Sequence, residues 1–216
     1  MTVDELYSSI ATSKPRVVYL NGKTSTGKST FARKIAADFG YEVINLDDIV
    51  VQSVLVPRDL ANQRSTVFLE VYKHRNKLDW IADFIRAARE IIDQHTQVGT
   101  PVVIDGAIAH VETMQDFLQP YADVYIAYFH PSNLELYSRY LTERFMGTTI
   151  NNHNGLPKAF WELVDTTEFA TFSETRTLTP SLRSSIAAYA QSSQTSSLDR
   201  IATLNHAFPT MTIVNI

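Results

Sequence analysis

The residues best suited to chemistry in this chain form one run, Gly-Lys-Thr-Ser-Thr-Gly-Lys-Ser-Thr, from Gly22 to Thr30. The run matches the pattern G-x-x-x-x-G-K-S/T, in which the glycines let successive backbone N–H groups point at one phosphate. Lys28 can reach the β- and γ-phosphates of a nucleotide, and the hydroxyl of Ser29 can ligate Mg²⁺. We therefore predict binding of a nucleoside triphosphate and Mg²⁺, with nucleotide contacts from Gly22, Lys23, Thr24, Ser25, Thr26, Gly27, Lys28, Ser29 and Thr30.

The segments on either side set this run in the order that the chemistry requires. Residues 17–20 are apolar and precede it, and apolar side chains recur at helical spacing from Phe31 to Phe39 after it. A strand, a loop and a helix in this order bring the positive end of the helix to the phosphates. The alternative is a merely flexible loop rich in glycine, serine and threonine.

Two further apolar runs end in carboxylates. Residues 41–46 read as a strand that precedes Asp47 and Asp48, and residues 101–104 read as a buried strand that precedes Asp105. Because ligands bind at the carboxyl ends of parallel strands, we expect these acids near the phosphate loop. Asp47 is predicted to be the general base for an acceptor hydroxyl, and Asp105 to hold Mg²⁺ through water. Helix capping by Asp47 and Asp48, and a turn at Asp105, are the structural alternatives.

Phosphoryl transfer commonly needs a cation beyond the loop lysine, and two arginines are candidates. Residues 133–146 read as a helix that ends close to Arg144, and residues 147–157 are rich in turn formers. We expect a mobile lid that brings Arg144 over the phosphates as a catalytic cation. Arg139 is predicted to contact the nucleotide as well, although one of the two arginines is expected simply to be solvated, as surface arginines commonly are.

The order of elements predicts an α/β fold, with a five-stranded parallel sheet and helices on both of its faces in a three-layer sandwich. Further helices are expected at residues 2–12, 57–77, 78–97, 111–118, 180–190 and 197–208, and further strands at residues 122–129 and 211–216. We predict a single domain of residues 1–216, with a core of residues 16–146 and 197–216, acceptor-side helices at residues 50–98, and a lid and variable region at residues 147–196.

Composition excludes several classes of function. A net charge of −4 gives no basic surface field, so we expect no nucleic-acid partner. The absence of cysteine excludes disulfides and thiolate metal sites. No stretch approaches the roughly 20 apolar residues of a membrane span, and the N-terminus lacks a signal pattern, so we expect a soluble, cytoplasmic protein with no membrane partner.

The run Leu20-Asn21-Gly22-x-x-Ser25-x-Gly27-Lys28-Ser29, followed by Asp47 after the second strand, resembles the P-loop small-molecule kinases. The likeness is greatest to chloramphenicol phosphotransferase-like enzymes and implies that Asp47 activates the acceptor hydroxyl. Val103-Ile104-Asp105-Gly106 is similar to the third-strand Asp-Gly of adenylate kinases, and Arg139 and Arg144 are similar to the lid arginines of the family.

The resemblance extends over residues 16–146 and has two departures. Ala107-Ile108-Ala109 stands where adenylate kinases have Pro-Arg, which argues against a nucleotide as the acceptor. The last predicted strand lies at the C-terminus, so adenine contacts are expected near residues 204–209.

Together these patterns predict a phosphotransferase that moves the γ-phosphoryl group of ATP to a hydroxyl of a small molecule, with Lys28, Asp47 and Arg144 as catalytic residues. A toxin-type kinase of nucleotide-sugars is a related alternative. A nucleotide-binding NTPase or switch without a phosphorylated acceptor is disfavoured because it leaves Asp47 with no obvious role. A degenerate binding module is disfavoured by the intact Lys28-Ser29.

Overall fold

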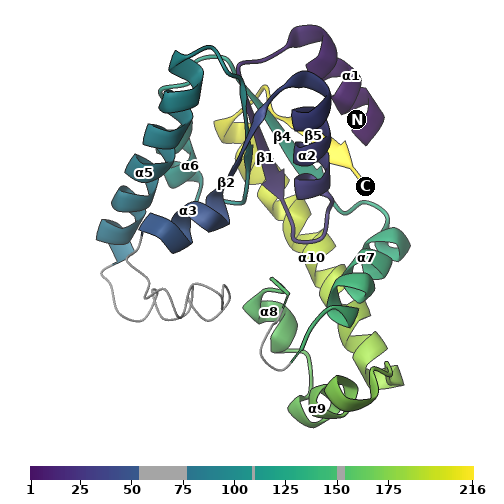
Figure 1. Ribbon diagram of the computed structural model, residues 1–216. Helices are drawn as coiled ribbons and strands as arrows, with labels where there is room; N and C mark the ends of the chain where they lie inside the picture. Colours follow the sequence, from purple (N-terminus) through teal and green to yellow (C-terminus); the bar gives the residue numbers. More distant parts are fainter. Residues whose placement is uncertain (54–76, 109, 150–153) are drawn as a thin grey trace.

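The computed structural model describes residues 1–53, 77–108, 110–149 and 154–216. Their strands form one parallel five-stranded sheet in the order β2-β3-β1-β4-β5 (Figure 1). The predicted α/β class and five-stranded parallel sheet are thereby confirmed. The strands are β1 (Val17–Gly22), β2 (Glu42–Asn45), β3 (Val102–Asp105), β4 (Val124–His130) and β5 (Thr212–Asn215).

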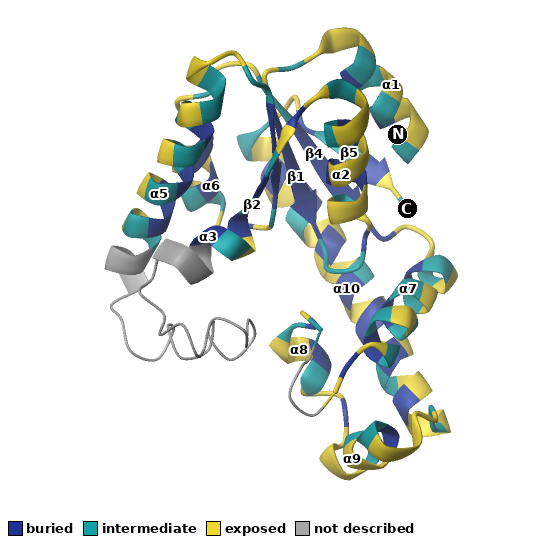
Figure 2. Ribbon diagram, viewed as in Figure 1, coloured by how far each residue is buried: buried dark blue, intermediate teal, exposed yellow. Residues whose placement is uncertain are grey.

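Helices cover both faces of the sheet, as predicted. All residues of β1 are buried, so successive side chains enter opposite layers. Val18 and Leu20 pack under α1 (Val3–Ser13) and α2 (Lys28–Phe39). Val17 and Tyr19 face the other layer, which consists of α5 (Lys77–Gln97), α6 (Val111–Leu118) and the second half of α10 (Pro180–Ala207). Figure 2 shows the buried strands between these helices.

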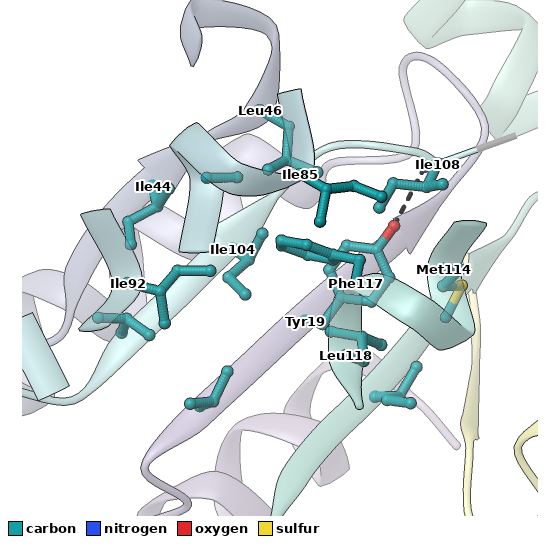
Figure 3. Close-up of a cluster of buried hydrophobic side chains, with 14 of the residues drawn as sticks. Tyr19, Ile44, Leu46, Ile85, Ile92, Ile104, Ile108, Met114, Phe117 and Leu118 are labelled. Carbon is teal, nitrogen blue, oxygen red and sulfur yellow. Dashed lines mark hydrogen bonds between the residues drawn. The ribbon is translucent and has the colours of Figure 1, made fainter. Parts of the chain in front are cut away.

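The layer under α5 and α6, which we call the sheet core, contains a polar anchor (Figure 3). Tyr19 is fully buried and its ring meets Phe117 edge to face, with centroids 6.3 Å apart. The Tyr19 hydroxyl accepts the backbone N–H of Ile108 at 3.1 Å, and Arg200 of α10 donates to the Ile108 carbonyl at 2.9 Å. These bonds tie the loop after β3 to β1 and α10, and so fix the edge on which β3 ends.

A separate core lies beyond the carboxyl ends of the strands, and we call it the outer core. It is formed by α7 (Leu134–Met146), α8 (Lys158–Trp161), α9 (Thr166–Thr175) and the first half of α10 (Figure 1). Phe145 lies at its centre, with ring centroids 4.6 Å from Phe172 and 5.7 Å from Phe160. The outer core therefore packs on its own aromatic side chains, and α7 and α10 connect it to the sheet.

Two predictions of secondary structure differ from the structure, and two short helices were not predicted. The prediction of short helices at residues 180–190 and 197–208 is wrong, because α10 is one helix of 28 residues. Its middle turns are rich in serine, and Ser193 and Ser197 are buried. Residue 46, predicted to end a strand, instead begins α3 (Leu46–Ser53), and α8 and α9 were not predicted.

The helix predicted at residues 57–77 lies outside the described residues except at its last position. Residues 150–153 of the predicted lid also lie outside them. Among the described residues, no helix combines the length and the apolar character needed to cross a membrane.

Candidate active site

The loop between β1 and α2 has the backbone expected of a phosphate-binding loop. Gly22 and Gly27 have φ angles of +134° and +85°, and Ser25 adopts the left-handed region at +62°. A Cβ on Gly22 would collide with the carbonyl oxygen of Phe129 in β4, so only glycine fits there. The side chain of Ser25 is in an unfavourable environment, because its Oγ is buried and has no hydrogen-bond partner among the described residues.

The loop opens onto the N-terminus of α2, which no side chain caps. Gly27 is the N-cap residue, and the first turn contains no acidic side chain. The N–H groups of a first helical turn lack partners within the helix, and the helix dipole makes this end positive. By contrast, Thr2, Asn133, Asp165 and Thr179 all cap their helices with side-chain oxygens. The N-terminus of α2 is therefore suited to bind an anion.

Lys28 extends back over the loop. Its Nζ donates to the Lys23 carbonyl at 2.6 Å and to Thr26 Oγ1 at 3.3 Å. Burial lowers its pKa to about 8; the carboxylate of Asp105 opposes this change, Arg144 adds to it, and Asp47 opposes it. The lysine thus lies within electrostatic reach of all three other charged groups predicted for the site.

Asp105 ends β3 at the centre of the sheet edge. It is 5% exposed, and in the strand register it lies beside Leu20 of β1 and Asn45 of β2. Gly106 follows at a φ of +151°, and a Cβ there would lie 2.7 Å from the Cβ of Leu46. The chain therefore passes close to α3 immediately after the Asp105 carboxylate, and it can do so because Gly106 has no side chain.

Asp47 is exposed and lies in the first turn of α3 instead of at the end of a strand. The Asn45 side chain caps this helix, accepting the N–H of Asp47 at 2.9 Å and of Asp48 at 3.4 Å. Asn45, and neither of the two aspartates, therefore supplies the cap of α3. The sequence signal for Asn45 was present, because asparagine is a preferred N-cap residue.

Arg144 lies in the last turn of α7, as predicted. Its Nε donates to the carbonyl of Asn154 at 2.6 Å. Partial burial lowers the pKa of the guanidinium, while Asp47, Tyr137 and Asp105 act in the opposite direction. Since Lys28 and Arg144 both respond to Asp47 and Asp105, the four groups from α2, α3, β3 and α7 share one electrostatic environment.

A cavity of about 1060 Å³ runs along this edge. Asp47, Asp105 and Arg144 line it together with the loop from Thr24 to Thr30. Other parts of its wall come from Leu136 and Tyr140 of α7, from Gly106 and Gly155, and from the C-terminal end of β5, where Asn215 is the last strand residue and Ile216 follows it. Residues 204–209, which were expected near adenine, do not line this cavity.

Two predicted nucleotide contacts lie apart from the others. The exposed Arg139 side chain lies 3.9 Å from Glu143 and against the ring of Tyr140, and it does not line the cavity. Helical spacing explains this, because Leu136, Tyr140 and Arg144 are four residues apart and share one face. Lys23 does not line the cavity either, and its Nζ donates to Ser196 of α10 at 2.8 Å.

One support of the loop was not predicted. Tyr137 of α7 is buried, and its hydroxyl donates to the carbonyl of Thr24 at 3.0 Å. Burial raises the pKa of this hydroxyl, so it remains a proton donor. No local pattern signals a bond between residues this far apart in sequence.

Residues 17–144, more than half of the chain, match a family model described as an AAA domain. The chain belongs to this AAA domain family. The match begins at β1, includes the phosphate loop and ends at Arg144, so it spans all four charged groups of the site. Together with the loop geometry and the parallel sheet, it shows that this AAA domain protein has an α/β fold of the P-loop kinase type.

Two solved structures are similar to this AAA domain protein. Shikimate kinase from Acinetobacter baumannii, in complex with shikimate, is 14% identical with a TM-score of 0.40, and the match covers 86% of this chain and 94% of that chain. TT1252 from Thermus thermophilus is 17% identical with a TM-score of 0.37, and the match covers 60% and 72% respectively. At these low values, neither structure bears on what the present chain acts on.

Proposed function

We propose that this chain is an ATP- and Mg²⁺-dependent kinase that transfers the γ-phosphoryl group to a hydroxyl of a small molecule. The observation that carries the proposal is the gathering of Lys28, Asp47, Asp105 and Arg144 around one cavity beside the uncapped N-terminus of α2. Two cations suit a polyphosphate, and two carboxylates suit a metal ion and an acceptor proton. The resemblance to chloramphenicol phosphotransferase-like enzymes is consistent with this chemistry.

The triphosphate of ATP is proposed to bind along the loop. Backbone N–H groups between Gly22 and Ser29 and the first turn of α2 would hold the β-phosphate. The ammonium of Lys28 donates hydrogen bonds to the Lys23 carbonyl and Thr26 Oγ1, so it lies inside the loop before the phosphates bind. Nearby phosphate charges favour its protonated form and oppose the effect of burial on its pKa.

Ser29 and Asp105 are the residues proposed to hold Mg²⁺. Both line the cavity, and both offer the oxygen ligands that Mg²⁺ prefers. Mg²⁺ usually takes one or two protein ligands and completes its shell with water and phosphate, so a larger carboxylate cluster is not required. When bound there, the ion would neutralise charge on the β- and γ-phosphates.

Asp47 is proposed to accept the proton of the acceptor hydroxyl. The acceptor oxygen then forms a bond to the γ-phosphorus, the bond from that phosphorus to the β-phosphate oxygen breaks, and ADP leaves with the electron pair. Arg144 stabilises charge on the transferred group. Asp47 is suited to this role because it lines the cavity and is exposed, so an acceptor can reach it.

A screen for acceptors tests this function. Hydroxyl-bearing antibiotics, sugars and nucleosides are added singly with MgATP, and ADP release is measured for the native protein and for Asp47→Ala. We expect one chemical class to stimulate ADP release, and a loss of about 10²- to 10⁴-fold in kcat for the variant. Asp48→Ala is the matched control, because Asp48 lies in the same helical turn but does not line the cavity.

Two outcomes of the screen would contradict the proposal. The first is that the protein binds ATP but no acceptor class stimulates ADP release. Slow hydrolysis of ATP without an acceptor, together with an oligomeric state that depends on the nucleotide, would then indicate a switch. The second is full activity in Asp47→Ala. Loss of activity in Asp48→Ala alone would move the role of base to the neighbouring carboxylate.

A further inference from the structure

Arg144 is fixed at the cavity by a turn formed by Asn154 and Gly155. The Nε of Arg144 donates to the Asn154 carbonyl at 2.6 Å, and the Asn154 side-chain Nδ2 donates back to the Arg144 carbonyl at 2.8 Å. One bond orients the guanidinium, and the other holds the main chain of the last turn of α7. The reciprocal pair therefore constrains the arginine at both ends of its side chain.

The backbone of this turn is specialised for the contact. Asn154 and Gly155 have φ angles of +49° and +66°, a region that glycine adopts freely and asparagine better than most residues. A Cβ on Gly155 would lie 2.6 Å from Arg144 Nη2, and a Cβ on Gly147 would lie 2.7 Å from Asn154 Nδ2. The two glycines thus leave the space that the guanidinium and the amide occupy.

Fixing Arg144 in advance has a clear advantage for the proposed reaction. A long arginine side chain loses rotamer freedom when it is ordered, and this loss opposes binding if it occurs only when the ligand arrives. Here the guanidinium is already partly buried within reach of Asp47 and Asp105. Gly155 lines the same cavity as Arg144, so the turn lies directly at the site.

We propose that Asn154 and Gly155 are positioning residues, which hold the Arg144 guanidinium where the γ-phosphate of ATP binds. This inference rests on the proposed function, in which Arg144 carries charge toward the transferred group. It predicts that the turn contributes to the preference for ATP over ADP, because ADP lacks the phosphate that Arg144 would contact. That preference is measurable without knowledge of the acceptor.

The first test compares Gly155→Ala with Gly40→Ala. Gly40 has a similar φ of +73°, but a Cβ there would meet nothing within 4 Å, so the control carries the backbone strain without the collision. Affinities for MgATP and MgADP are measured by calorimetry. We expect Gly155→Ala and Arg144→Ala each to lower the ratio of the two affinities about tenfold, as for loss of one charge-assisted hydrogen bond. Gly40→Ala should lower Tm and leave the ratio unchanged.

A second pair of variants tests Asn154. Asn154→Gly keeps the left-handed backbone accessible but removes the amide, and it should lower the ratio while Arg144 is present. Asn133→Ala is its control, because Asn133 caps the other end of α7 through the N–H of Leu136 at 3.0 Å. It should lower Tm without a change in the ratio. The double variant Arg144→Ala/Gly155→Ala should match Arg144→Ala, because the turn acts through the arginine.

The inference is overturned if Gly155→Ala and Asn154→Gly keep the native ratio, or lower it further when Arg144 is absent. A nitrogen-15 NMR experiment separates this failure from failure of the proposed function. Arg144 should give a protected Nε–H signal that is absent in Arg144→Lys and shifted in Gly155→Ala. If the native protein shows this Nε–H signal but does not prefer ATP to ADP, the turn does position Arg144, and the proposed function is contradicted. An Nε–H signal that Gly155→Ala leaves unchanged overturns the turn itself.

Discussion

Replacing Lys28 with methionine should stabilise the nucleotide-free protein and abolish its binding of ATP. Burial holds the pKa of Lys28 at about 8, below its ordinary value of 10.5. That difference corresponds to about 3 kcal/mol at neutral pH, because each pKa unit is worth about 1.4 kcal/mol. Methionine removes this cost but also loses the two charge-assisted hydrogen bonds to the Lys23 carbonyl and Thr26 Oγ1, together worth about 2 kcal/mol. We therefore expect a net gain of about 1 kcal/mol in the free energy of unfolding.

The pH dependence gives this prediction its sign. Below pH 8 the lysine is charged in both the folded and the unfolded chain, so the cost of burying the charge is fully present. Between pH 8 and pH 10.5 the unfolded chain binds more protons than the folded chain, so the native protein gains stability relative to the variant. The advantage of Lys28→Met should therefore be largest at pH 7 and shrink steadily as the pH rises through this window.

Thermal and urea unfolding without nucleotide, at several pH values from 7 to 10, measure this difference. A gain of about 1 kcal/mol corresponds to an increase of roughly 2 to 4 °C in Tm for a chain of this size. Lys34→Met is the control, because Lys34 lies on the same helix but is exposed and paired with Asp38 at 2.9 Å. The control should show no gain. A Lys28→Met protein that is less stable than the native chain at pH 7, or an advantage that does not shrink with pH, would refute the reasoning.

Three further predictions concern the loop and its supports. Gly22→Ala should lower the free energy of unfolding, measured with urea, by about 3 kcal/mol or more, because its Cβ collides with the backbone of Phe129. Gly99→Ala is the control and should cost only about 1 kcal/mol, because the space around Gly99 is open. Tyr137→Phe removes the bond to the Thr24 carbonyl, so it should cost about 1 kcal/mol of stability and raise KM for ATP several-fold with little change in kcat; an unchanged KM would show that this bond does not order the loop. Arg139→Ala should keep ATP affinity within about twofold in calorimetry, because the side chain pairs with Glu143 at the surface, and a tenfold loss would return Arg139 to the nucleotide site.

The parts of the fold that were predicted correctly have local signals in the sequence. Glycines, a loop lysine and an apolar run are enough to define β1, the phosphate loop and the start of α2. The buried strand before Asp105 is likewise a continuous apolar run, and each of its residues is buried in the structure. The rule that parallel strands present ligands at their carboxyl ends then brought Asp47, Asp105 and Lys28 together.

The wrong helix prediction and the contacts that were not predicted lie where tertiary packing outweighs local pattern. The serine-rich middle of α10 has no apolar stripe, yet Ser193 and Ser197 are buried there, so counting apolar residues broke the helix in two. The distinction between Arg139 and Arg144 required knowledge of which face of α7 meets the cavity. The bonds of Tyr137 to Thr24 and of Arg144 to Asn154 join distant or irregular segments, for which no periodicity exists.

Because α10 is continuous, it acts as a rigid strut of about 42 Å that joins two cores. Leu182, Ile186 and Tyr189 bury one end in the outer core, and Ile201 and Leu204 bury the other in the sheet core. Deleting a single residue between these groups would turn one end by about 100° relative to the other and shorten the strut by about 1.5 Å. The number of residues between the two groups is therefore fixed by packing at both ends, although the serine-rich sequence gives no sign of this. Insertions or deletions in the middle of α10 should be far less tolerated than substitutions.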